Sequence, residues 1–161
     1  MKFFFPAIFL VSISLQAQPI ETAETVDIGG IKQWIKIEGT NDKAPVLLFL
    51  HGGPGNSVMS YANRFSRGWK EHFVVVQWDQ RQSGVTATRS PTAPVTLDLM
   101  IQDTEAMVSY LYHRFGNKKV YLVGHSWGGY LALRVAGSNP SMLAACVAMS
   151  PMTSQVKSDS I

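Results

Sequence analysis

Three short, almost purely apolar runs recur along the chain, and each leads directly into a loop of glycine or polar residues. They span residues 45–50, 73–78 and 119–123. Apolar runs without alternation are typical of strands buried on both faces, as in a parallel sheet covered by helices. Because amphipathic stretches separate the runs, the sequence predicts an α/β fold, with a mostly parallel sheet and helices on both faces.

Three more strands are expected on either side of these runs. Residues 24–28 and 31–38 flank Gly29 and Gly30, which can adopt the positive φ angles of a tight turn. We therefore expect these two strands to form an antiparallel hairpin. A sixth strand is predicted at residues 143–149, and the residues after it are polar.

Helices are predicted between the strands. They are expected over residues 57–70, over residues 97–115 and from the loop after the third run to about Ala136. Thr96 can cap the second helix and Gly116 can end it. Its apolar face would consist of Leu97, Ile101, Thr104, Val108, Leu111 and Phe115. Residues 85–94 are rich in Thr, Ser and Pro and predict an exposed loop.

The composition is that of one globular domain. Of the 161 residues, 46% are hydrophobic and 16% are charged, which is enough apolar material for a sizeable core. The net charge is +3, and the Lys and Arg residues are scattered, which argues against nucleic acid as a partner. The single cysteine, Cys146, excludes an internal disulfide and is expected to pack as a small hydrophobe.

Residues 1–17 have the pattern of a signal peptide. Lys2 is followed by an apolar stretch from Phe3 to Leu15 and then by small or polar residues. We therefore expect export to the periplasm or the medium. The stretch is too short to span a bilayer, so no stable membrane span is expected. The alternative is a cytoplasmic protein in which these residues form a strand or helix, although Pro6 interrupts both patterns.

The third apolar run leads into Gly124-His125-Ser126-Trp127-Gly128, which matches the pattern Gly-x-Ser-x-Gly. Between a buried strand and a helix, this pattern predicts a nucleophile elbow, in which a strained turn lifts the serine hydroxyl above the sheet. Gly124 and Gly128 are needed because side chains there would collide in so sharp a turn. Ser126 is therefore the predicted nucleophile.

Two backbone N–H groups are candidates for an oxyanion hole beside Ser126. The first is that of Trp127, at the N-terminus of the predicted helix, where the helix dipole favours negative charge. The second should come from the loop at residues 51–55, whose glycines let the backbone approach a reacting carbonyl. We favour the N–H of Gly53, with that of Gly52 as the alternative.

These motifs together resemble those of the α/β-hydrolases, and within them the proline iminopeptidase-like group of serine peptidases. The resemblance is carried by HGGPG at 51–55, by WDQR at 78–81 followed by Ser83 and Gly84, and by GHSWGG at 124–129. It covers about residues 24–149, which correspond to the first half of such a fold.

The resemblance also implies structural roles. His51 and His125 would shape their two loops, and Asp79 and Arg81 would tie their loop to the neighbouring active-site loop. Gln82 departs from the family pattern, because similar proteins carry glycine there.

The partners that would activate Ser126 do not follow it in the sequence. In this family an acid and then a histidine come after the serine. No histidine follows His125, and the only later acid is Asp159, a weak candidate for the triad. Residues 24–161 are therefore interpreted as the N-terminal part of an α/β-hydrolase domain, cut after about the sixth strand, without its cap. The isolated chain is predicted to be inactive, and its unpaired apolar edge predicts aggregation or a partly molten state.

For the complete domain, the resemblance implies attack by Ser126 on an amide or ester and release through an acyl-enzyme. The implied substrate is a short peptide with an N-terminal proline or another small residue, and an ester stays open. No metal or organic cofactor is required. Two other interpretations are a non-catalytic binding protein that keeps this half of the fold, and an incomplete polypeptide. We favour the latter, because the chain stops in a polar loop just after a strand.

Overall fold

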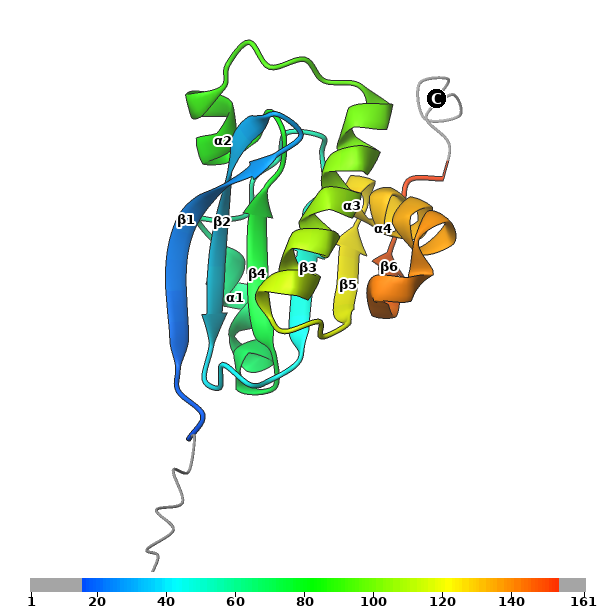
Figure 1. Cartoon of the computed structure of the whole chain (residues 1–161). Helices are drawn as coiled ribbons and strands as arrows, with labels where there is room; N and C mark the ends of the chain where they lie inside the picture. Colours follow the sequence, from blue (N-terminus) through cyan, green and yellow to red (C-terminus); the bar gives the residue numbers. More distant parts are fainter. Residues whose placement is uncertain (1–15, 154–161) are drawn as a thin grey trace, which may run out of the picture.

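A six-stranded sheet forms the centre of the molecule, and the computed structural model describes residues 16–153 (Figure 1). In their order across the sheet, the strands are β1 (Ile20–Ile28), β2 (Ile31–Gly39), β4 (Val74–Asp79), β3 (Val46–Leu50), β5 (Val120–His125) and β6 (Leu143–Met149). β2 pairs antiparallel with β1 and with β4, whereas β4, β3, β5 and β6 run parallel to one another. The predicted α/β architecture is confirmed.

The β1–β2 hairpin forms at the predicted turn. Ile28 pairs with Ile31, and Gly29 and Gly30 have φ angles of 57° and 76°. β1 begins earlier than predicted because Ile20 pairs with Gly39 at the far end of β2.

Helices cover both faces of the sheet, as predicted. They are α1 (Ala62–Ser66) with a 3-10 turn at Arg67–Glu71, α2 (Gly84–Arg89), α3 (Leu97–Arg114) and α4 (Trp127–Ser138), followed by a short 3-10 turn at Pro140–Met142. α3 and α4 lie on one face and α1 on the other (Figure 1). The hydroxyl of Thr96 accepts from the N–H of Leu99 at 3.2 Å, which confirms the predicted cap of α3.

Three helix predictions were wrong in detail. The first helix begins at Ala62 rather than at 57, and α2 occupies the first part of the predicted loop at 85–94. The buried side of α3 is also rotated from the predicted one: Leu97 is 43% exposed. The buried residues are Met100, Asp103, Thr104, Met107, Val108 and Leu111.

Alternate residues of the central strands pack into two hydrophobic layers, one on each face of the sheet. Leu48, Val76 and Leu122 pack with α3 and α4, while Leu47 and Val75 pack beneath α1. All five residues of β3 are buried, as its unbroken apolar sequence predicts. Cys146 is only half-buried, because it lies on the edge strand β6, although it contacts the core as expected.

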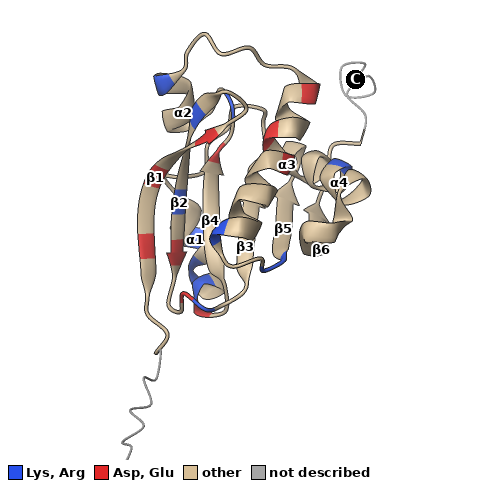
Figure 2. Ribbon diagram, in the orientation of Figure 1, with Lys and Arg blue, Asp and Glu red and all other residues tan. Residues whose placement is uncertain are grey.

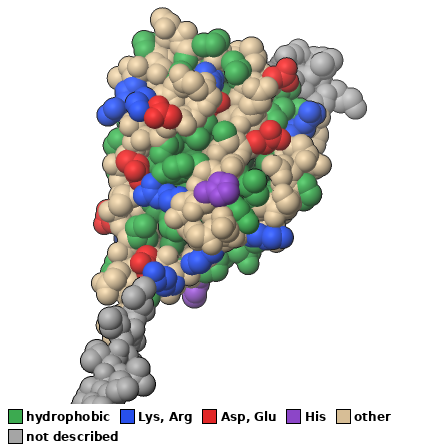
Figure 3. Space-filling view, in the orientation of Figure 1, with side chains coloured by type: hydrophobic (Ala, Val, Ile, Leu, Met, Phe, Trp, Pro, Cys, Tyr) green, Lys and Arg blue, Asp and Glu red, His purple; other side chains and the backbone are tan. Residues whose placement is uncertain are grey.

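Charges are spread over the surface. Figure 2 shows Lys and Arg interspersed with Asp and Glu on strands and helices, and the face in Figure 3 mixes small hydrophobic patches with charges of both signs. Among residues 16–153, no helix has the length and apolarity needed to cross a membrane. The signal peptide predicted at residues 1–17 falls almost wholly outside the described residues, as does Asp159.

β6 has no charged side chain and is paired, within the described residues, only with β5. Val147 is 50% exposed on it, whereas the opposite edge strand, β1, carries Glu21, Glu24 and Asp27. Charged residues protect sheet edges from pairing with other chains.

We predict that the isolated 161-residue chain self-associates and that Val147→Lys raises its monomer fraction, measured by light scattering. Thr22→Lys on β1 is the control, and equal effects of the two would contradict the prediction.

Candidate active site

Ser126 lies in the turn between β5 and α4 and has φ 54° and ψ −115°. This is a conformation that non-glycine residues rarely adopt, and it costs about 1–3 kcal/mol. Hydrogen bonds hold the turn from both sides: the Ser126 N–H donates to the Met149 carbonyl at 3.0 Å, and its carbonyl accepts from the N–H groups of Tyr130 and Met152. The strained turn predicted for an elbow is therefore present.

Gly124 and Gly128 are required by close backbone packing. A Cβ on Gly124 would lie 2.1 Å from the carbonyl oxygen of Gly128, in agreement with the predicted collision. A Cβ on Gly128 would lie 2.1 Å from the carbonyl oxygen of Leu50. Gly128 is thus needed for contact between α4 and β3 as well as for the turn itself.

We predict that Gly128→Ala destabilises the protein by about 3 kcal/mol, because backbone atoms must move to accept the methyl group. Gly137→Ala is the matched control: it lies in the same helix with nothing within 4 Å of its Cβ position, and it should stabilise by about 0.5–1 kcal/mol. Chemical unfolding should be measured on the longest polypeptide that the gene encodes, called the full-length protein below. Equal effects of the two substitutions would contradict the packing argument.

Two loops meet beside Ser126. A Cβ on Gly52 would lie 3.4 Å from the Cβ of Ser126, so the backbone after β3 runs next to the elbow. No backbone carbonyl in residues 16–153 accepts a hydrogen bond from the N–H of Gly52, Gly53 or Trp127. These donors are thus available to an oxyanion, and the choice of Gly53 over Gly52 stays a prediction.

His51 is fully buried behind this loop. Its Nδ1 lies 2.8 Å from the Gly52 carbonyl, and its Nε2 lies 3.0 Å from the Ser83 hydroxyl and 3.3 Å from the Gln80 N. Burial lowers the pKa of His51, although its hydrogen bond to Gly52 and the charge of Asp79 oppose the shift. His51 is therefore a neutral structural group near neutral pH.

No base for Ser126 is found in the part of the chain that the structure describes. The ring nitrogens of His51 and His113 bond other groups, namely Gly52, Ser83 and Asn117. His125 is exposed and lies against Gly52, on the neighbouring loop. His72 precedes β4, at the end of the parallel strands opposite to Ser126. The same residues contain no group of three or more His, Cys, Asp or Glu placed to hold a metal ion.

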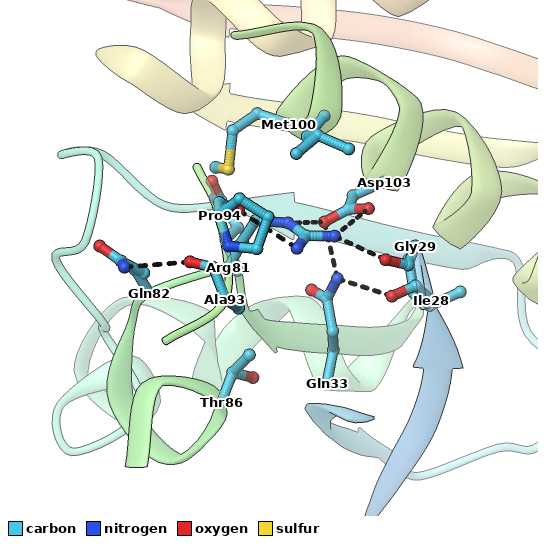
Figure 4. Close-up of polar contacts among 12 residues, drawn as sticks. Ile28, Gly29, Gln33, Arg81, Gln82, Thr86, Ala93, Pro94, Met100 and Asp103 are labelled. Carbon is cyan, nitrogen blue, oxygen red and sulfur yellow. Dashed lines mark hydrogen bonds and ion pairs between the residues drawn. The ribbon is translucent and has the colours of Figure 1, made fainter. Parts of the chain in front are cut away.

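The loop after β4 is fastened by buried polar groups. Asp79 accepts from the hydroxyl of Ser57 and, at 2.8 Å, from the N–H of Val85, so it links the loop after β3 to the start of α2. Gln82 has φ 56°, the backbone conformation for which glycine is favoured, and its amide donates to the Ala93 carbonyl at 3.2 Å (Figure 4). Gln82 thus occupies a glycine-type conformation.

The bonding partners of Arg81 within the described residues lie outside the active-site loops, so the role expected for it was wrong. It forms a buried ion pair with Asp103 of α3, with Nε 2.8 Å from Oδ2, and it donates to the Gly29 and Pro94 carbonyls (Figure 4). Gln33 completes the network by donating to Asp103 at 2.7 Å. Asp103 and Gln33 were not predicted from the sequence; the only signal was that Asp103 lies one helical turn from the apolar Met100 and Met107.

A serine at positive φ between a parallel strand and a helix, flanked by N–H groups that no backbone carbonyl of residues 16–153 accepts, is the geometry of an α/β protein with a nucleophile elbow. Comparison with known proteins agrees with this class. Residues 45–160 match the family model described as alpha/beta hydrolase fold. The chain belongs to this family.

Within this family, the chain is similar to several individual proteins. The chain is 38% identical over 128 residues to a probable aminopeptidase of Bacillus subtilis, and the matched region covers 79% of this chain and 40% of that protein. It is 31% identical over 137 residues to human protein phosphatase methylesterase 1, with 81% and 34% covered. A crystal structure of a proline iminopeptidase-related protein from Thermus thermophilus superposes with a TM-score of 0.64 at 29% identity, with 78% and 43% covered. The chain spans less than half the length of each.

Proposed function

We propose that the full-length protein is a serine hydrolase that cleaves an amide or ester through an acyl-enzyme on Ser126. The observation that carries this proposal is the backbone of Ser126, held at φ 54° beside three N–H groups that donate to no backbone carbonyl of residues 16–153. Strain of this kind persists only where the surrounding structure enforces it, and it is concentrated at functional sites.

The proposed reaction has two steps. The Ser126 oxygen attacks the carbonyl carbon, and the resulting oxyanion accepts hydrogen bonds from Trp127 and Gly53 while the amine or alcohol departs with a proton. Water then attacks the acyl-serine and releases the acid. The acid and histidine that move the protons are proposed to come from the part of the family fold outside the described residues.

The proposed substrate is a short peptide whose N-terminal residue, proline or another small residue, is removed. The support is the similarity to a probable aminopeptidase and to a proline iminopeptidase-related structure. The experiment is to compare the full-length protein on prolyl p-nitroanilide, on the same compound with its amine acetylated, and on a peptide methyl ester. Preference for the free prolyl amide supports the proposal, whereas preference for the methyl ester assigns the site to ester hydrolysis, for which the methylesterase relative is the precedent.

A non-catalytic binding protein is the second candidate. The observation that favours it is that no base contacts Ser126 within residues 16–153. An unassisted serine hydroxyl is a poor nucleophile near neutral pH. This candidate would be selected if the full-length protein hydrolyses none of the three compounds and if Ser126→Ala leaves the binding of prolyl p-nitroanilide unchanged.

A further inference from the structure

The peptide that joins Gly52 to Gly53 is held in one orientation. Its carbonyl oxygen lies 2.8 Å from Nδ1 of His51, on the buried side of the loop. The peptide is trans, so its N–H, which belongs to Gly53, points in the direction opposite to the carbonyl. A group that holds the Gly52 carbonyl toward the protein interior therefore turns the Gly53 N–H away from the interior.

The hydrogen-bond partners of His51 decide which nitrogen carries the proton. The N–H of Gln80 is a fixed donor and lies 3.3 Å from Nε2, so Nε2 must accept. Nδ1 faces the Gly52 carbonyl, which can only accept, so Nδ1 must donate. The opposite neutral tautomer would set a lone pair against a carbonyl and two N–H groups against each other.

The ring itself is fixed by the loop after β4. The Ser83 oxygen lies 3.0 Å from Nε2, and the Gln80 amide donates to the carbonyl of His51 at 3.1 Å. The same oxygen lies 2.8 Å from the Gln80 carbonyl, so the single hydroxyl proton of Ser83 can be donated either to Nε2 or to that carbonyl. All three residues are buried, so the ring has no freedom to release the Gly52 carbonyl.

We propose that His51 is a positioning residue for the oxyanion hole: its Nδ1–H holds the Gly52 carbonyl and thereby aims the Gly53 N–H at the reacting carbonyl oxygen beside Ser126. This inference rests on the proposed hydrolase function. It assigns to His51 an effect on the transition state, through one peptide plane, beyond the shaping of its loop.

Two substitutions separate this role from general support of the fold. In His51→Asn the amide nitrogen can take the place of Nδ1, whereas in His51→Gln the polar group takes the place of Nε2. In the full-length protein we expect His51→Gln to lower kcat by roughly 10²-fold, the scale of losing one oxyanion donor, with little change in KM. His51→Asn should restore kcat to within about tenfold of the natural protein, because it keeps the donor to Gly52.

Equal losses of kcat in the two variants, or a loss confined to KM, would overturn the proposal. Melting temperatures of both variants supply the control, because both remove buried contacts and a purely structural role predicts that kcat follows stability. A kcat that falls in proportion to the melting temperature across the pair would likewise overturn it.

A spectroscopic measurement tests the geometry without any hydrolysis. Long-range ¹H–¹⁵N correlation on full-length protein labelled at histidine distinguishes the two neutral tautomers. A proton on Nδ1 of His51 supports the assignment even if no substrate is cleaved, in which case only the hydrolase function is lost. A proton on Nε2 would overturn the positioning role whatever the activity.

Discussion

Ser126→Ala in the full-length protein is expected to lower kcat by roughly 10⁴- to 10⁶-fold and to leave KM nearly unchanged. The hydroxyl forms the covalent bond to the substrate, and removing the nucleophile of a serine hydrolase leaves only the contribution of oxyanion donors and binding. The melting temperature should stay close to that of the natural protein, because the turn is held through backbone groups of Ser126. Steady-state kinetics on the preferred substrate and thermal unfolding measure the two effects.

The matched control is Ser141→Ala. This exposed serine lies in the turn after α4, and its hydroxyl bonds only the side chain of Asn139. It should leave kcat within about twofold of the natural value, as expected for a surface change away from the site. A comparable loss of activity in both variants, or residual activity of Ser126→Ala above about a tenth, would show that Ser126 is not the nucleophile.

Breaking the buried ion pair between Arg81 and Asp103 is expected to have the largest effect on stability. Both side chains are 1% exposed, and Asp103→Asn leaves the guanidinium buried without its counter-charge. Such a change typically costs about 3–5 kcal/mol. The measurement is the free energy of unfolding of the full-length protein in urea.

Asp27→Asn provides the comparison at a matched distance. Asp27 and Lys32 are 2.8 Å apart, like Arg81 and Asp103, but their side chains are 75% and 59% exposed. An exposed pair is worth about 0–1 kcal/mol. The double variant Arg81→Gln, Asp103→Asn should be less destabilised than the sum of its parts, because the second change removes the unpaired charge. A cost of Asp103→Asn no greater than that of Asp27→Asn would contradict this account.

The strands could be predicted because burial on both faces leaves a direct trace in the sequence. The unbroken apolar run of β3 and the glycine pair of the first hairpin need no information from the rest of the chain. The strained turn at Ser126 could be located for the same reason: its strand, its glycines and its helix are consecutive. Local sequence determines such features, and the structure bears them out.

Features set by distant residues could not be predicted. α2 forms in a segment rich in β-branched residues because the carboxylate of Asp79 accepts from the N–H of Val85 at its first turn, and Thr86 bonds β2 and β4. Arg81 finds Asp103 on α3, 22 residues away, where the helix pattern predicted a different buried side. Propensity and periodicity contain no record of such long-range pairs.

The predicted first helix failed for a related reason. The residues before Ala62 form an irregular loop with several turns, in which the hydroxyl of Ser57 donates to Asp79. The same loop carries Gly52 and Gly53, two of the three oxyanion candidates, so its irregular course is part of the site. Departures from local preference are expected where a chain builds a functional site.

The most direct test of the account is the labelling of the full-length protein with a fluorophosphonate, which forms a covalent bond only with an activated serine. Tryptic digestion and mass spectrometry then identify the modified residue, with the Ser126→Ala variant treated in parallel. We expect one adduct, on Ser126, and none in the variant. Absence of any adduct on the native full-length protein, or an adduct on another serine, would contradict it.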